Sequence, residues 1–426
     1  MRSPMNAIWF GLLLAAVLAA AITGRMEEVT KVSFDTAKAA VNLALGLIGP
    51  MALWLGLMKI AEEGGLLKVL ARSLRPLMVR LFPRVPPEHP AMSAMILNLS
   101  ANMMGLGNAA TPFGVKAMVE LEKINPRPGV ASDAMCLFLA INTSNVTLLP
   151  LGVMAIRAAA GAKDPAAIIL PTIFATGVST LVAIVAAKAL ARKHEEPPPI
   201  LEDQPPQTTA EELDDVPASQ PLIKWGLILL FFFLLIRAAW SILEADDSRA
   251  ALADVFSNWF VPLLMLALAS YGLVKKVPVY EAACEGAKEG FKVAVRIIPY
   301  LVIILTAVGM FRASGGFEAM AKVLEPLTSL VGLPVEVLPV ALLRPLSGSG
   351  AFALMSEIVS RAPDSFAAYL ASTIQGSTET TFYVLAVYFG AAGIKDPRYA
   401  IWAALAADLA GILAATFICH LTYPGS

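Results

Sequence analysis

Long blocks of apolar residues alternate with short polar segments along most of this 426-residue chain. Each block has about 20 residues, the length that a helix needs to cross a hydrocarbon core of about 30 Å. We interpret the first block as a helix that is retained, because no small-residue cleavage site followed by soluble sequence comes after it. The blocks predict about nine transmembrane helices, at residues 6–23, 39–61, 131–158, 165–190, 222–243, 252–274, 293–312, 366–392 and 396–420.

Two further apolar stretches, 89–121 and 334–359, are interrupted by Gly, Pro, Asn and Ser. Each is longer than one span requires and shorter than two spans. Segments of this kind enter the membrane and turn back, with their irregular backbone covered by protein or facing a cavity. The predicted fold is therefore an all-α polytopic membrane protein with two re-entrant or broken hairpins.

A polar segment, residues 193–221, divides the chain. From Glu195 to Pro221 it contains eight acidic residues, seven prolines and no lysine or arginine. Such a composition does not bury a core and is typical of a disordered linker. It predicts two membrane units, residues 1–192 and 222–426, joined by the linker.

The two units resemble each other. Residues 159–165 read AAGAKDP and residues 391–397 read AAGIKDP, with six of seven positions identical at an offset of 232. Residues 64–77 match 315–327 with small gaps, and the broken stretches also correspond. Several matches in the same order indicate an internal duplication.

The charges that follow equivalent spans differ between the two units. In the first unit the span 39–61 is followed by five basic residues, whereas the equivalent segment 315–330 carries Lys322 with Glu318 and Glu325. Because Lys and Arg collect on the cytoplasmic side, this difference predicts an inverted-topology repeat. The same rule places the N-terminus and the linker in the cytoplasm. The basic residues of the first unit are Lys68, Arg72, Arg75, Arg80 and Arg84.

Polar residues inside the apolar blocks form four clusters, two in each unit, and are the candidates for binding a substrate or ion. Polar groups at this depth are expensive and tend to be functional. A pseudo-twofold arrangement brings equivalent clusters together, where broken helices expose N–H and C=O groups. The candidates are Asn98, Ser100, Asn102, Asn108, Asn142, Thr143, Ser144, Asn145, Arg344, Ser347, Ser349, Gln375, Ser377, Thr378 and Glu379.

Two alternatives remain open for these clusters. The Asn, Ser and Thr side chains are equally suited to hydrogen bonds between helices. Arg344 suits a carboxylate or phosphate, and Glu379 a proton or cation, but the two also suit a plain ion pair. Asp408 is a weaker candidate.

Composition excludes several classes of protein. Of the residues, 57% are hydrophobic and 15% charged, and the net charge of −1 does not favour nucleic acid as a partner. The three cysteines lie in apolar blocks and the three histidines are far apart, so no metal site or disulfide is predicted. No nucleotide-binding loop or recognised catalytic motif occurs. We therefore predict neither an enzyme nor a bound cofactor.

Longer motifs carry a resemblance to known families. Residues 6–190, with HPAMSAMILNLSANMMGLGNAATPFGVKAM at 89–118, resemble the spore maturation A family. Residues 275–422, with LLRPLSGSGAFALM at 342–355, resemble the spore maturation B family. Both are similar to the nucleoside-recognition, or Gate, group, which implies a transporter-like fold in a bacterial cytoplasmic (inner) membrane and an oligomer, with a dimer as the simplest expectation.

The sequence thus favours a secondary transporter of a small polar, anionic organic solute, such as a dicarboxylate, nucleoside, amino acid or small peptide. Transport is driven by a coupling ion, H+ or Na+, or runs downhill. Membrane lipids are the other expected partners, particularly at the basic amphipathic segment 66–82. The alternative is a non-transporting scaffold for envelope or spore maturation.

Overall fold

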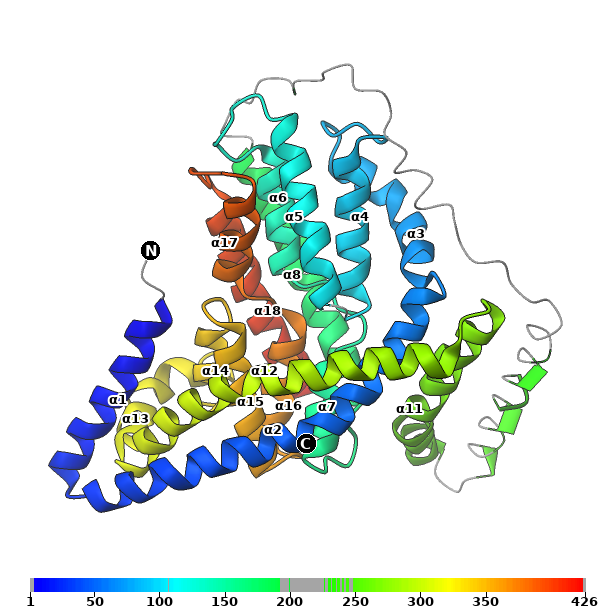
Figure 1. The fold of residues 1–426 in the computed structure, drawn as a ribbon. Helices are drawn as coiled ribbons and strands as arrows, with labels where there is room; N and C mark the ends of the chain where they lie inside the picture. The colour runs from blue at the N-terminus through cyan, green and yellow to red at the C-terminus, as the bar shows by residue number, and fades with distance from the viewer. Residues whose placement is uncertain are drawn as a thin grey trace.

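Apolar helices make up most of the computed structural model, which describes residues 4–105, 107–191 and 248–423 and isolated positions between 199 and 244. These residues contain no β-strand, and Val130 and Asp396 form an isolated bridge. The chain is an all-α multi-pass membrane protein, as its apolar blocks predict. Its helices (Figure 1) are α1 (Pro4–Thr23), α2 (Met26–Glu63), α3 (Leu66–Leu81), α4 (Pro90–Met103), α5 (Gly107–Lys123), α6 (Asp133–Thr143), α7 (Leu151–Ala159), α8 (Ile169–Ala191), α11 (Ser248–Val274), α12 (Val279–Ala313), α13 (Gly316–Ser329), α14 (Leu338–Leu343), α15 (Gly348–Arg361), α16 (Phe366–Ser377), α17 (Thr381–Ala391) and α18 (Ala400–Thr422).

Three helices within the described ranges, α2, α8 and α18, are long and apolar enough to cross a membrane. Shorter apolar helices lie at Trp9–Thr23, Asp133–Thr143, Pro262–Val274 and Leu301–Ala313. The predicted hairpins at 89–121 and 334–359 correspond to the pairs α4–α5 and α14–α15. The linker 193–221 and the span 222–243 lie outside the described residues, apart from isolated positions.

Two predicted spans differ from the prediction because each is broken into two helices. Residues 131–158 form α6 and α7, and residues 366–392 form α16 and α17. In the first break Asn145 has a φ of 46°, and Pro150, which lacks an N–H, precedes α7. In the second, Thr378 is extended at φ −135° and ψ 164°. The polar clusters that looked like the middle of a continuous span therefore lie where the helix is interrupted.

The duplication is visible element by element. A long helix, α2 or α12, leads through a left-handed glycine, Gly65 or Gly315, into α3 or α13. A hairpin, a broken helix and a long apolar helix follow in each unit. After α7 and α17 the repeated AAGxKDP motif places Gly161 and Gly393 at φ 79° and 71°, a conformation that glycine adopts without strain.

Equivalent helices of the two units run in opposite directions. The helices α2 and α12 lie side by side in Figure 1, with Ala52 next to Gly290 and Thr36 next to Gly309. Residue numbers therefore increase along one helix in the direction in which they decrease along the other, so the two helices are antiparallel. Along α8 and α18, the ring of Phe174 lies 6.4 Å from that of Phe417. One turn further along α8, the Ser179 hydroxyl donates to the carbonyl of Ala407 at 2.8 Å. This antiparallel pairing is what an inverted repeat requires.

Small residues let α2 and α12 approach closely. A Cβ at Gly286 would lie 2.3 Å from the carbonyl oxygen of Leu55, and one at Gly290 would lie 2.5 Å from the Cα of Ala52. These neighbours are backbone atoms, which do not move aside as a side chain does. Close backbone contact through glycine is the usual way in which membrane helices associate.

We expect Gly286→Leu to separate α2 from α12 and to lower stability by about 3 kcal/mol or more, since overpacking of a well-packed contact costs about 1–3 kcal/mol. The measurement is the thermal unfolding midpoint of the purified protein in detergent. The matched control is Gly49→Leu on α2, where a Cβ meets nothing within 4 Å. Equal midpoints for the two variants would contradict the assigned contact.

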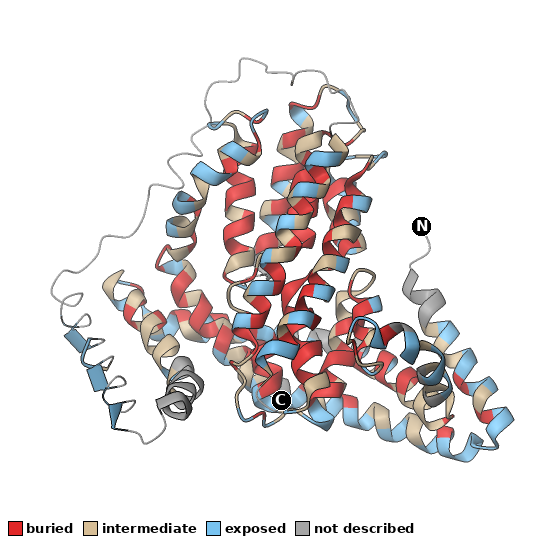
Figure 2. Cartoon of the chain, turned by 180° about the vertical axis from the view of Figure 1, so that it is seen from behind, coloured by how far each residue is buried: buried red, intermediate tan, exposed pale blue. Residues whose placement is uncertain are grey.

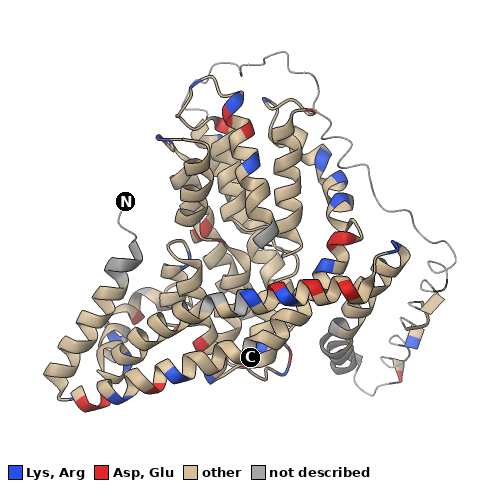
Figure 3. Cartoon of the chain, in the orientation of Figure 1, with Lys and Arg blue, Asp and Glu red and all other residues tan. Residues whose placement is uncertain are grey.

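Buried and charged residues occupy different parts of the molecule. Buried residues run along the helices that stand upright in Figures 1 and 2, which are α4, α5, α6, α8, α17 and α18, and the first half of α2 is mostly exposed (Figure 2). Large apolar residues such as Ile22, Leu181, Trp402 and Phe417 face outward, as lipid-facing residues do. Charged residues gather at the ends of the upright helices and along α2 and α12 (Figure 3). Among the described residues, the charged side chains that are buried are Arg157, Arg344 and Asp408.

Candidate functional site

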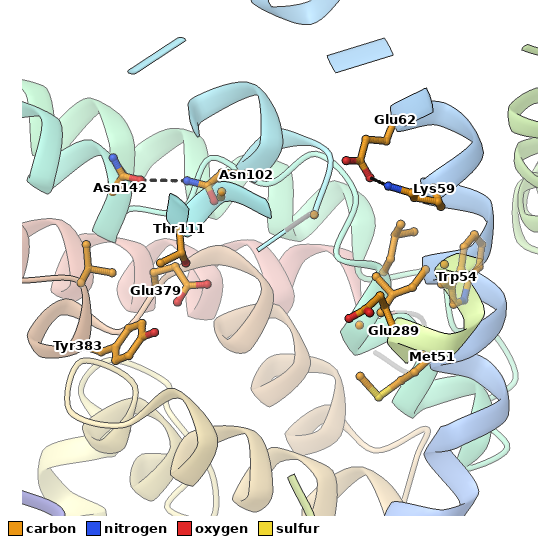
Figure 4. A pocket seen from close by; sticks show the side chains of 18 of the residues that line it. Met51, Trp54, Lys59, Glu62, Asn102, Thr111, Asn142, Glu289, Glu379 and Tyr383 are labelled. Atoms are coloured by element: carbon orange, nitrogen blue, oxygen red, sulfur yellow. Dashed lines mark hydrogen bonds and ion pairs between the residues drawn. The ribbon is translucent and has the colours of Figure 1, made fainter. Parts of the chain in front are cut away.

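A cavity of about 730 Å³ lies between the α2–α12 pair and the broken helices. Figure 4 shows its two walls: Met51, Trp54, Lys59, Glu62 and Glu289 on one side, and Asn102, Thr111, Asn142, Glu379 and Tyr383 on the other. Both repeat units thus contribute to each wall. The remaining lining residues are Leu55, Gly105, Ala110, Leu151, Gly152, Ala155, Glu285, Gly286, Val384 and Tyr388.

An amide and phenol network forms the polar wall. The Asn102 amide donates to Asn142 Oδ1 at 3.1 Å, and the Tyr388 hydroxyl donates to the same oxygen at 3.4 Å. Asn98 in turn donates to the Tyr388 oxygen at 3.0 Å and to the Ala110 carbonyl at 2.7 Å. The network joins α4 and α6 of the first unit to α17 of the second. It holds three neutral polar side chains, those of Asn102, Asn142 and Tyr388, at the cavity surface.

Gly114 makes room for Tyr388. A Cβ at Gly114 would lie 2.1 Å from the Tyr388 hydroxyl, so no larger residue fits while the phenol stays in place. We expect Gly114→Ala to displace the hydroxyl from both asparagines and to lower stability by about 1–3 kcal/mol. The thermal midpoint measures this change. Gly390→Ala on α17, where a Cβ meets nothing within 4 Å, should leave it unchanged.

The two helix breaks contact each other. The backbone N–H of Glu379 donates to the carbonyl of Thr143 at 2.8 Å. The Asn145 amide donates to the carbonyls of Gly376 and Thr378 at 3.2 and 3.4 Å. Some backbone N–H and C=O groups that have no partner in their own broken helix thereby form hydrogen bonds with the other break, as buried polar groups require. The clusters predicted in the two units do meet.

Arg344 holds the second break together and does not line the cavity. Its guanidinium donates to Thr380 Oγ1 at 3.2 Å, to the carbonyl of Gln375 at 3.3 Å and to the carbonyl of Thr378. Arg344 Nη2 lies 3.7 Å from Glu379 Oε2, and the side chains are 3% and 39% exposed. The ion pair, one of the two alternatives, is therefore present, with Glu379 on its cavity side.

The other predicted residues make local contacts. Ser347 caps α15 by accepting from the Gly350 N–H at 3.1 Å, and it lies beside Ser349. Gln375 Oε1 is buried and has no hydrogen-bond partner in the described structure. The side chain of Asn108 lies outside the described residues. The hydroxyls that donate to carbonyls of their own helix or its end are those of Ser100, Thr143, Ser144, Ser377 and Thr378.

The sequence did not predict that charged residues of α2 and α12 line the cavity. Lys59 pairs with Glu62 at 3.2 Å, whereas Glu285 and Glu289 pair with lysines three positions later, at 2.7 and 2.6 Å. These glutamates precede the predicted span 293–312, so they looked like part of a loop. Their four-residue spacing, one helical turn, was the available signal that α12 begins earlier. Tyr388 carried no such signal, because an aromatic residue in an apolar helix is ordinary.

Metal binding has little support in the described ranges. No group of three His, Cys, Asp or Glu side chains comes together there. In the described structure, no disulfide joins the cysteines Cys136, Cys284 and Cys419. His420 Nε2 lies 2.8 Å from the carbonyl of Gly332, and the His420 ring packs on Phe366. These residues are thus placed for packing rather than for ligating a metal.

Comparison with known proteins agrees with this architecture. A family model described as Gate, nucleoside recognition, matches residues 44–190 and 294–395, one segment in each unit. The chain is 45% identical over 181 residues to spore maturation protein A of Bacillus subtilis, which is 42% of this chain and 92% of that protein. It is 45% identical over 171 residues to spore maturation protein B of the same organism, which is 39% of this chain and 96% of that protein. The chain therefore belongs to the Gate family of nucleoside-recognition membrane proteins, with a Gate segment in each of two inverted units.

Proposed function

We propose that this protein is a secondary transporter of a small polar organic solute, which binds between the α2–α12 pair and the broken helices. The observation that carries the proposal is the cavity of about 730 Å³, where the breaks of both units meet beside Asn102, Asn142 and Glu379. Inverted repeats with a midplane site at broken helices are the architecture of many secondary transporters. No recognised catalytic motif accompanies the site, which favours transport over an enzyme.

The lining favours a neutral or cationic solute rather than the anionic one expected from Arg344. Arg344 is 3% exposed, is absent from the cavity lining, and already donates through both terminal nitrogens, so it does not offer a guanidinium to a carboxylate or phosphate in the cavity. Lys59, the one basic residue among the described lining residues, is paired with Glu62. An anion entering the cavity would find four glutamates and would lose hydration without gaining a partner.

Nucleosides and amino acids are the solutes to test first. Trp54 and Tyr383 bring aromatic faces to opposite walls, and Asn102 and Asn142 supply amide groups for hydrogen bonds. Such a combination suits a base with its ribose, which accords with the nucleoside-recognition description of the family model. An amino acid or small peptide would place its ammonium group toward Glu379.

Uptake into proteoliposomes tests the proposal directly. The purified protein is reconstituted and offered radiolabelled uridine, adenosine, lysine, alanine, a dipeptide and succinate, with and without proton and sodium gradients. We expect saturable uptake of a neutral or cationic member, and succinate to be excluded. A folded protein that transports no member would count against the proposal, and preference for succinate would overturn the charge argument.

A scaffold role in envelope or spore maturation is the second candidate, favoured by the names of the two relatives, spore maturation proteins A and B. It predicts that changes at Asn142 and Glu379 leave the phenotype of a deletion strain fully complemented. It also predicts that changes on the exposed face of α3 abolish complementation. Loss of complementation by the cavity variants alone would exclude it.

We place the protein in the bacterial cytoplasmic membrane, with its N-terminus and linker inside and a dimer as the expected assembly.

A further inference from the structure

A buried carboxyl group lies behind the second helix break. Asp408, in the middle of α18, is 2% exposed. Its Oδ2 accepts a hydrogen bond from the Thr381 hydroxyl at 2.6 Å. Its Oδ1 is buried and has no hydrogen-bond partner in the described part of the chain. A carboxylate in hydrocarbon surroundings normally collects two or more donors, so half of this group is unsatisfied.

The charged neighbours of Asp408 are few. Within the described residues, Arg344 and Glu379 are the charged groups that act on it electrostatically. Among the helices packed against α18, the charged side chains of α6 and α8 are the terminal Asp133 and Lys188, and α16 and α17 carry tyrosines but no charged residue. The net charge around Asp408 is therefore set by one guanidinium and two carboxyl groups, Asp408 included.

If all three groups are ionised, one of the two carboxylates has no countercharge. Arg344 balances one carboxylate, and Glu379, which is 39% exposed and 3.7 Å from Arg344, is the better placed of the two. Asp408 then needs either a proton or a bound cation, because an isolated buried carboxylate is strongly disfavoured. Buried unpaired carboxyl groups in membrane proteins commonly belong to proton pathways.

A proton fits this position better than a metal cation. A metal ion at Asp408 would need several further oxygen ligands. The Thr378 carbonyl at this break already accepts from Arg344, and the Thr381 hydroxyl is directed at the carboxylate. An added cation would also lie within range of the Arg344 charge, which acts on Asp408. A proton neutralises the carboxyl group without a ligand shell.

We propose that Asp408 is the proton-binding carboxyl group that couples this protein to the proton gradient. The inference rests on the proposed transport function and names its coupling ion. Asp408 is protonated while Arg344 pairs with Glu379. When a solute engages Glu379 from the cavity, Arg344 is free to balance Asp408, whose O–H bond then breaks, and the proton passes to water in the cavity. Glu379 is the group between the cavity and Arg344, and Thr381 is a positioning residue.

Infrared difference spectroscopy tests the protonation of Asp408 without any solute. The full-length protein in lipid nanodiscs is titrated with acid and base, and the carbonyl-stretch band of a protonated carboxylic acid is followed. We expect such a band at pH 7 in the wild type and its loss in Asp408→Asn. The control is Glu357→Gln, which removes a carboxyl group that is ion-paired with Arg312 at 2.9 Å and should leave the band in place.

A second variant covers the case in which Asp408→Asn does not fold. Thr381→Val removes the hydrogen bond to Asp408 Oδ2, so the band should persist but move to higher frequency. A band that is unchanged in Thr381→Val, or that survives in Asp408→Asn, would overturn the assignment. Absence of the band in the wild type, with a sodium-dependent thermal stabilisation that Asp408→Asn removes, would make the site a sodium site instead.

Coupling is tested by uptake of a radiolabelled solute, chosen as a member of the uptake panel that the wild type transports. We expect Asp408→Asn to lose at least tenfold of the accumulation driven by a pH gradient while it retains exchange of solute across equal pH. Gradient-driven accumulation that persists in this variant would overturn the coupling role. If the wild type transports no member of the panel, the proposed function loses its support, and the infrared result still decides whether Asp408 holds a proton.

Discussion

Arg344→Leu is expected to reduce stability by about 3–5 kcal/mol, the range for removing one partner of a buried charge network. The guanidinium is 3% exposed and donates to the carbonyls of Gln375 and Thr378 and to the hydroxyl of Thr380. Leucine removes the donor to the Gln375 carbonyl and the Thr380 hydroxyl and leaves the Thr378 carbonyl with the 3.4 Å bond from Asn145 alone, and each unsatisfied group costs about 1–3 kcal/mol. The yield of monodisperse protein and its thermal midpoint in detergent measure the loss.

Two controls separate burial from charge. Arg361 is also an arginine paired with a carboxylate, 3.6 Å from Glu357, but its side chain is 63% exposed. Since exposed ion pairs contribute about 0–1 kcal/mol, Arg361→Leu should leave the midpoint almost unchanged. Arg344→Lys keeps the charge but loses the planar fork and should fall between the two. Equal midpoints for Arg344→Leu and Arg361→Leu would show that Arg344 does not hold the break.

Asn142→Leu is expected to have the largest effect on transport, a loss of about 10- to 100-fold in initial uptake rate. Its Oδ1 accepts from both Asn102 and Tyr388 at the cavity surface. Leucine removes that acceptor and releases Asn102 and Tyr388 at the cavity surface, and a hydrogen bond contributes about 0.5–1.5 kcal/mol, so two approach the stated loss. The measurement is solute uptake by proteoliposomes at matched protein content.

The matched control for Asn142→Leu is Ser100→Ala. Ser100 is a buried polar residue on α4, two positions from Asn102, but its hydroxyl donates to the carbonyl of Ile96 in its own helix at 2.8 Å. We expect uptake by Ser100→Ala to stay within about twofold of the wild type, since only one local hydrogen bond is lost. Similar losses in both variants would mean that the network supports folding rather than binding.

Much of the fold was predictable because it follows from local patterns. The apolar blocks anticipated α2, α8 and α18, and the repeated motif after α7 and α17 anticipated equivalent turns. Charge bias anticipated the antiparallel order of α2 and α12. The breaks after Thr143 and Ser377 were not recognised as helix ends, since short runs of Asn, Ser and Thr do not by themselves interrupt an apolar helix.

The candidate site was only partly predictable. Asn102, Asn142 and Glu379 were identified as polar groups in apolar blocks, and they line the cavity. The same criterion also selected Ser100 and Ser347, whose hydroxyls serve their own helices, because sequence does not reveal which side chain finds a local acceptor. Glu285 and Glu289 were missed because they lie outside the apolar block.

The sequence by itself determined the class of protein, the duplication and the set of polar residues that enter the membrane, because hydrophobic length, repeated motifs and charge bias are properties of local sequence. Only the tertiary structure decided which of these residues meet. The antiparallel pairing of α2 and α12 places glutamates of both units across the cavity from Asn102 and Asn142. The packing of α18 against the second break buries Asp408 beside Thr381. Contacts between residues far apart in the chain depend on how the two inverted units pack, and that packing decides that Arg344 holds the second break and does not line the cavity.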